Sequence, residues 1–432
     1  MQLERESFVI RFLKRIYNPP IQPRRTIIYD VAKKLSTNPL VNAHADFAVN
    51  LLQKSIGLEG SCSSCCISPL AISWALTLCL QECPKLNDAK TEILKAVAGG
   101  HSLQDQLDYL CGVAESLAGL AASSTLHLDR YLCVDQDLPL ADSYTQSIQG
   151  FGSNLVQRVK YSNPEEANEK ICTLLNDDPN LASSSKDEIS NSIAKALGDP
   201  SALLLLAGIS FPSIRWTERF DKTATKMRNF CTIKGQKVQV KMMYKFSGET
   251  HYSENDQVQR IFLPIATDSQ SRKVTRRKLT MALFLPRQKN GLKKLLPKMN
   301  GKMLLEWISE RDLKCDVHVY VPMFKISNIS RLKQPLQRIG ASTAFDTRGT
   351  LDGIFEGKNA YLGDVIARGH IELTEQGNRS PGLTTSELTE SQQDDRILPR
   401  PTADRTFKAN HSFIYVILTG KGDILCVGAV TE

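Results

Sequence analysis

The fold is decided by a stretch that begins His370-Ile371-Glu372-Leu373-Thr374-Glu375, whose apolar–polar alternation predicts a strand with one buried face. Two apolar runs close it, Ile414-Tyr415-Val416-Ile417-Leu418 and Ile424-Leu425-Cys426-Val427-Gly428-Ala429-Val430, joined by the turn residues Thr419-Gly420-Lys421-Gly422-Asp423. They predict a buried hairpin. Between the two strand regions lies a polar run of about thirty residues, against a usual loop of roughly 4–6. The sequence therefore predicts a long functional or disordered loop.

The residues that flank this loop form a recognisable pattern. They are Asn359-Ala360, Asp364-Val365-Ile366, Glu372, Glu375-Gln376-Gly377, Phe407-Lys408-Ala409-Asn410-His411-Ser412-Phe413 and Val427-Gly428-Ala429-Val430. The pattern resembles the serpins, a family of serine protease inhibitors, in which this loop is the exposed reactive-centre loop offered to proteases. The resemblance extends upstream to about Asp46.

Two further signals lie in the middle of the chain. Ser68-Pro69 resembles the family's entry to its buried helix, and the spacing of Trp216, Phe220, Thr225 and Phe230 is the most specific internal match. The resemblance implies an α+β serpin fold, with a large mixed central β-sheet, two smaller sheets and about eight or nine helices. We expect a single domain over residues 44–432, a reactive-centre loop at about 377–406, and a basic, partly disordered extension over residues 1–40.

Composition and motifs exclude several classes of function. The chain of 432 residues is 41% hydrophobic and 23% charged, as in soluble globular proteins. No apolar run reaches 18 residues, so no membrane span is expected. Gly-x-Ser-x-Gly, His-Glu-x-x-His and phosphate-loop motifs are absent from the sequence, which argues against an enzyme and a cofactor. Cys62-Ser63-Ser64-Cys65 has metal-ligand spacing but no second pair, so no metal site is expected.

The segment after Gly377 is the hinge of the predicted loop. The resemblance implies that, after a protease cuts the loop, this segment inserts into the large sheet as a new central strand. Pro381 cannot donate to a strand ladder and Gly382 favours a turn. Alternation sends Asn378 inward, where an unpaired amide costs about 1–3 kcal/mol. We therefore predict that insertion stalls. The predicted hinge comprises Glu375, Gly377, Asn378, Arg379, Ser380, Pro381 and Gly382.

The region that opens for insertion also departs from the family. Ala71, Gly208 and Ala367 stand where the resemblance implies a serine, an asparagine and a histidine beneath the sheet, and Ser68 alone remains. A polar network that has lost most members is better replaced by packing. These positions favour a sheet that no longer opens, and so a non-inhibitory or weakly inhibitory protein that acts by binding.

A working inhibitor is the alternative. Counted back from Phe407, the resemblance implies a scissile bond near residues 396–400. Our first choice is Arg396-Ile397, because a trypsin-like serine protease cuts after a cationic residue. Arg400-Pro401 is a poor bond because proline follows the cation. The loop is also several residues longer than usual, so a cut would favour substrate behaviour over trapping.

Charge suggests a third function class. The net charge is +8, and one run holds five cations in seven residues: Arg272, Lys273, Arg276, Arg277 and Lys278. Lys289, Lys293, Lys294, Lys298 and Lys302 follow. These residues favour a sulfated polysaccharide, because the aromatic residues that nucleic acids stack on are not interleaved with them.

Localisation and assembly are expectations from the resemblance. The resemblance implies an extracellular monomer, yet no secretory signal is visible at the N-terminus, which leaves an intracellular location open. On a secretory route, Asn328 and Asn378 would be candidate glycosylation sites, each in an Asn-x-Ser/Thr triplet.

Overall fold

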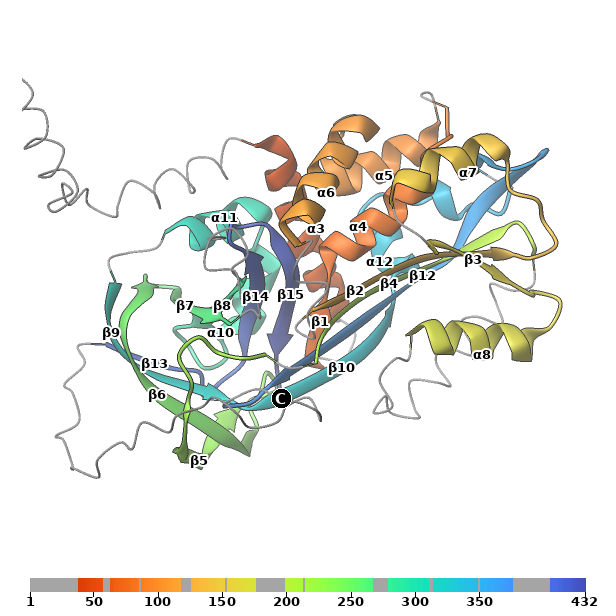
Figure 1. The fold of residues 1–432 in the computed structure, drawn as a ribbon. Helices are drawn as coiled ribbons and strands as arrows, with labels where there is room; N and C mark the ends of the chain where they lie inside the picture. The colour runs from red at the N-terminus through yellow and green to blue at the C-terminus, as the bar shows by residue number, and fades with distance from the viewer. Residues whose placement is uncertain are drawn as a thin grey trace, which may run out of the picture.

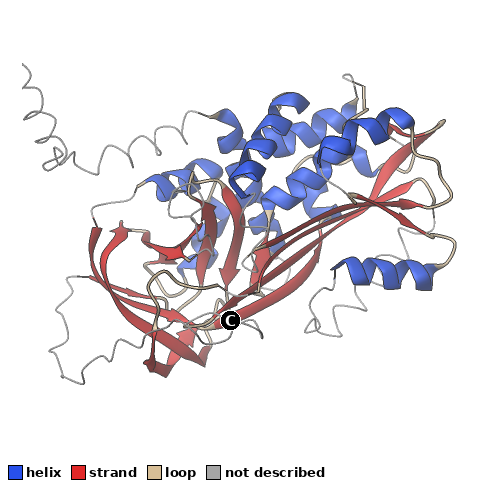
Figure 2. Cartoon of the chain, in the orientation of Figure 1, coloured by secondary structure: helices blue, strands red, loops and turns tan. Residues whose placement is uncertain are grey.

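Two mixed β-sheets and a set of helices make up the part of the chain that the structure describes (Figures 1 and 2). The structure is a computed structural model. It describes residues 38–56, 63–84, 87–117, 126–151, 154–175, 199–212, 214–266, 279–310, 314–348, 350–375 and 405–432.

The first sheet, called here the long sheet, has six strands. Its order is β10-β12-β4-β2-β3, with β11 pairing β12 off this path. The strands are β10 (Phe324–Arg331), β12 (Lys358–Leu373), β4 (Ala202–Phe211), β2 (His127–Asp135), β3 (Val156–Val159) and β11 (Leu351–Phe355). Parallel pairs, β12 with β4 and β2 with β3, alternate with antiparallel ones, so the sheet is mixed as expected.

The second sheet has nine strands. Its order is β1-β15-β14-β8-β7-β6-β9-β13, with β5 pairing β6. The strands are β1 (Cys65–Ile67), β15 (Ile424–Val430), β14 (Phe413–Thr419), β8 (Leu279–Pro286), β7 (Val258–Ile265), β6 (Lys237–Glu254), β9 (Lys314–Pro322), β13 (Arg405–Lys408) and β5 (Asp221–Cys231). The expected buried hairpin is confirmed as β14–β15. The long strand β6 pairs with β5, β9 and β7, which joins what the sequence suggested as two smaller sheets.

Nine α-helices lie within the described residues, in agreement with the expected eight or nine. They are α3 (Pro39–Ser55), α4 (Pro69–Leu78), α5 (Asp88–Ala98), α6 (Leu103–Leu117), α7 (Asp142–Ile148), α8 (Pro164–Leu175), α10 (Gly291–Leu295), α11 (Gly301–Ser309) and α12 (Lys333–Arg338). Short 3₁₀ helices are η1 (Gln149–Phe151), η2 (Leu296–Lys298) and η3 (Thr343–Phe345). In the part of the chain described, no helix combines the length and apolarity needed to cross a bilayer.

The helices cover the long sheet unequally. Figure 1 shows α4–α7 on one side of the long strands and α8 on the opposite side. All ten residues of α4 are buried, in agreement with the buried helix that the resemblance at Ser68-Pro69 implied. The first helix starts earlier than expected, at Pro39 rather than His44. Asn38 caps it by accepting a hydrogen bond from the Leu40 amide, and proline suits the first helical position.

Candidate functional site

The centre of the candidate site is the seam between β4 and β12. These parallel strands pair directly over ten positions, from Tyr361 opposite Ala202 to Ile371 opposite Phe211. One register shift, between Leu362 and Asp364, interrupts the ladder. Every residue of β4 is buried. A strand inserted here would have to replace this whole ladder with two new ones, so its own amides must all be able to donate.

Helix α8 shares an apolar cluster with this seam. Its buried residues Ala167, Ile171 and Leu175 share one apolar cluster with Leu204 and Leu206 of β4 and Ile366 of β12. The cluster therefore spans both strands of the seam. Separating β4 from β12 would divide this cluster, and burying a large aliphatic side chain is worth about 1.5–3 kcal/mol.

Ser68 and Ala71 lie at the start of α4, on the core side of the long sheet. The Ser68 hydroxyl accepts a hydrogen bond from the Ala71 amide at 3.1 Å and donates to the Leu425 carbonyl at 2.8 Å. Ser68 is thus the N-cap of α4, a role that is typical of serine directly before a proline at the first helical position. Ala71 is fully buried by packing alone.

Gly208 and Ala367 lie on opposite faces of the long sheet. Ala367 is in phase with Val365 and belongs to the main core cluster, on the side of α4. Gly208 is in phase with Leu204 and Leu206, which face α8. A Cβ added at Gly208 would lie 3.0 Å from an Asp129 carboxylate oxygen of β2. The structure therefore brings Ser68, Ala71 and Ala367 to the core side and separates Gly208 from them.

The described part of β12 ends in a set of contacts that we call the hinge anchor. The Trp216 indole donates to the Thr374 carbonyl at 2.9 Å, and the Thr225 hydroxyl donates to the Glu375 carboxylate at 2.8 Å. Phe220 stacks edge-on against Trp216, with ring centroids 5.4 Å apart, and its amide donates to the Glu375 carbonyl. The residues that match the family by spacing thus hold the last turn before the predicted loop.

A buried lysine supports the hinge anchor. Lys245, only 5% exposed, donates to the carbonyl and carboxylate of Glu218, and its ammonium lies 5.3 Å from the centre of the Phe220 ring. Desolvation lowers the pKa of Lys245, and the charge of Glu218 opposes this. Ser247 also donates to Glu218, at 2.6 Å. These bonds fix the backbone between Trp216 and Phe220.

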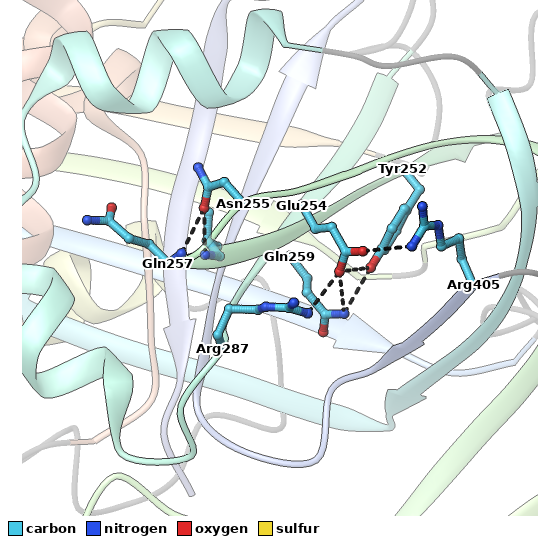
Figure 3. A network of polar contacts seen from close by, with 8 residues as sticks. Tyr252, Glu254, Asn255, Gln257, Gln259, Arg287 and Arg405 are labelled. Atoms are coloured by element: carbon cyan, nitrogen blue, oxygen red, sulfur yellow. Dashed lines mark hydrogen bonds and ion pairs between the residues drawn. The ribbon is translucent and has the colours of Figure 1, made fainter.

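A second cluster, the Glu254 network, holds the strand on the other side of the loop (Figure 3). Glu254 pairs with Arg405, the first residue of β13, at 3.1 Å and with Arg287 at 2.8 Å. Tyr252 and Gln259 donate to the same carboxylate. Arg405 lies 151 residues from Glu254 in the chain, so no local sequence pattern indicates this contact.

The charge of Glu254 should make this network sensitive to acid. Partial burial opposes the charged carboxylate, but the bonds from Tyr252 and Gln259 and the two arginines outweigh it and lower the pKa of Glu254. The resulting stability is present above the unfolded pKa, about 4.3, and is lost as the pH falls through the lower folded value.

We expect Glu254→Gln to lower the free energy of unfolding by about 1 kcal/mol at neutral pH, because exposed pairs contribute roughly 0.2–1 kcal/mol each. Denaturant melts from neutral pH down to pH 3 should show the difference between wild type and variant shrinking below the unfolded pKa. A difference that stays constant down to pH 3 would contradict this assignment.

Several predicted site residues lie outside the described residues. They are Gly377, Asn378, Arg379, Ser380, Pro381, Gly382, Arg396, Ile397, Arg272, Lys273, Arg276, Arg277 and Lys278. Asn328, a candidate glycosylation site, is described. Its side chain accepts from the Cys66 amide at 2.8 Å and donates to the Ser330 hydroxyl at 3.3 Å, joining β10 to β1. This structural role argues against a glycan at Asn328.

The sequence was compared with models of known families. Residues 42–432 match the model of the family described as serpin, serine protease inhibitor. The chain is 26% identical to Serpin B3 of Homo sapiens over 282 residues, 64% of this chain and 66% of that protein. It is 25% identical to the antitrypsin of Bombyx mori over 224 residues, 51% of this chain and 53% of that protein. These alignments cover less than two thirds of either relative.

Solved structures show the same fold. The native state of tengpin, a thermophilic serpin, superposes with a TM-score of 0.70 at 18% identity, covering 90% of this chain and 93% of that one. The similarity supports the architecture of two mixed sheets and helices described above.

Proposed function

The chain belongs to the serpin family, and from that premise we propose that it acts by binding and traps proteases weakly or not at all. The observation that carries this proposal is the chemistry of the hinge that follows the hinge anchor. Glu375 lies two residues after the end of β12 and is held by the Thr225 hydroxyl, and Asn378, Pro381 and Gly382 follow it within seven residues. A strand that contains Pro381 lacks an amide donor at that position, so it is a poor occupant of the seam.

The closed seam adds to this argument. Opening it would cost the ten-position ladder between β4 and β12 and would divide the apolar cluster that Ile366 and Leu206 share. An incoming strand with small side chains and a complete set of amides could offset that cost. An incoming strand with an unpaired amide side chain and a proline would offset less of the cost of opening the seam. Insertion of the loop would then be slower than release of the cleaved chain by the protease.

The test is incubation with trypsin followed by a denaturing gel. We expect a loop-cleaved product and no protease complex that survives denaturation. The antitrypsin of Bombyx mori is a positive control for the gel, and Arg396→Ala should remove the cleavage product if Arg396-Ile397 is the exposed bond. A stable complex with the wild-type chain, lost in Arg396→Ala, would establish the alternative, an inhibitor of trypsin-like proteases.

A further inference from the structure

Two buried cysteines meet on neighbouring strands of the second sheet. Cys66 lies in β1 and Cys426 in β15, and their sulfur atoms are 3.3 Å apart. Both are free thiols in the structure, and their side chains are 1% and 0% exposed. The two positions are separated by 360 residues of chain, so it is the assembled sheet that brings these thiols together.

The register of β1 and β15 explains the contact. The two strands are antiparallel, and Cys66 lies opposite Gly428. Residues two apart on a strand share a face, so Cys426 lies on the same face of the sheet as Cys66, one diagonal step away. Because Gly428 has no side chain, the Cys66 thiol can lean along β15 toward Cys426.

The surrounding residues close this site. Tyr415 of β14 lies opposite Gly428, and its hydroxyl donates to the Cys65 carbonyl at 2.9 Å. A Cβ on Gly428 would clash with the Tyr415 ring. Alternation along β1 turns the neighbouring thiol, Cys65, to the opposite face. Cys66 is therefore the partner that β1 offers to Cys426.

The separation of the two thiols is close to that of a covalent bond. A disulfide joins its sulfur atoms at about 2.0 Å, so Cys66 and Cys426 would have to approach by about 1.3 Å from their present 3.3 Å. Rotation about the Cα–Cβ bonds moves sulfur atoms on this scale. Bond formation therefore fits the strand pairing that the structure already has.

We propose that Cys66 and Cys426 form a disulfide when the chain folds in the presence of a low-molecular-weight disulfide such as oxidised glutathione. The Cys66 thiolate attacks one sulfur of the oxidant and releases a first glutathione thiolate. The Cys426 thiolate then attacks the Cys66 sulfur and releases the second. The chain gives up two electrons and two protons, and the oxidant takes them up in becoming two thiols.

Burial determines when the bond forms. The thiolate is the reacting species, and desolvation raises the pKa of the buried Cys426 thiol well above its usual value. Inside the folded chain, both sulfurs are also shielded from oxidants and reductants in solution. We therefore expect the disulfide to form during folding and to resist reduction afterwards.

The bond would fix a junction between the two sheets. The Cys66 amide donates to the Asn328 side chain of β10 at 2.8 Å. Its carbonyl packs against Gly369 of β12, where a Cβ would clash with it. Gly369 is paired with Ile209 in the seam. A covalent link from β15 to β1 would thus hold a segment that supports the seam, whether or not the protein traps proteases.

The test maps the bond in the full chain refolded with oxidised and reduced glutathione. Free thiols are alkylated in denaturant, the chain is digested, and linked peptides are fragmented in a mass spectrometer to distinguish Cys66 from Cys65. We expect a linked pair that joins Cys66 to Cys426. In the folded chain, dithiothreitol should cleave this link at least about tenfold more slowly than in denaturant.

A matched pair of variants separates the bond from packing. Cys426→Ala removes one sulfur of the pair, whereas Cys79→Ala removes an equally buried sulfur, whose thiol donates to the Ala75 carbonyl. The oxidised forms of wild type and Cys79→Ala should melt about 2–5 °C above their reduced forms. Cys426→Ala should lose this difference.

Three results would overturn the proposal. Alkylation of both Cys66 and Cys426 in the oxidised wild-type chain would show that these thiols stay reduced. A link from either of them to another cysteine would show that the strand register does not select the pair. A melting difference that persists in Cys426→Ala would assign the redox effect to other cysteines. The mapping uses the wild-type chain, so it decides the question even if a variant fails to fold.

Discussion

Cleavage of the loop should leave the melting temperature of this protein essentially where it was. In a serpin whose loop inserts, the cut segment adds a strand to the long sheet and the protein becomes more stable. Here the segment carries Asn378, Pro381 and Gly382, and the seam that it would have to enter is already paired over ten positions. We therefore expect a change of no more than about 1 °C on cutting, the effect of less than 1 kcal/mol in a domain of this size.

A repaired hinge provides the contrast. The triple variant Asn378→Ala, Pro381→Ala, Gly382→Ala provides a backbone amide donor at position 381. It also removes the amide side chain of Asn378 and the turn-favouring Gly382. If it inserts after cutting, a gain of about 5 kcal/mol would raise the melting temperature of a domain of this size by about 6 °C. The measurement is a thermal melt of each protein before and after limited trypsin treatment. A sharp rise in the cut wild-type chain would refute the stalled insertion.

Local apolar patterns account for the parts of the fold that the sequence predicted well. The two runs of the predicted hairpin, which became β14 and β15, are buried at every residue. In such elements the consecutive residues alone predict burial, because a stretch with no polar face is stable only inside the protein. The segments on either side of the loop were likewise predicted, because their residues carry the resemblance to the family.

The site depended on contacts that no local pattern records. Gly208 faces α8 and not α4 because of the register between β2 and β4, and alternation alone does not fix which face is which. Glu254 meets Arg405 because β13 pairs beside β9 in the assembled sheet. The Asn38-Pro39 start of α3, in contrast, was visible in the sequence as a cap followed by proline.

The second large effect concerns the hinge anchor. Trp216→Ala should lower the free energy of unfolding by about 3–5 kcal/mol, the usual cost of truncating a buried large aromatic residue. Trp216 is 3% exposed, and its loss would also leave the Thr374 carbonyl without its indole donor. Trp216→Phe keeps most of the packing and removes the hydrogen bond, so it should cost roughly 1 kcal/mol from that bond, plus a smaller packing loss.

The specific effect on the anchor separates this prediction from general destabilisation. Trp307, 4% exposed and packed against Phe284, is a matched residue of the same type in α11. Trp307→Ala should destabilise the chain by a similar amount and leave the end of β12 protected. Hydrogen exchange of residues 371–375 should rise well above that of the wild type in Trp216→Ala only. Equal exchange in both variants would mean that Trp216 contributes stability without positioning the base of the loop.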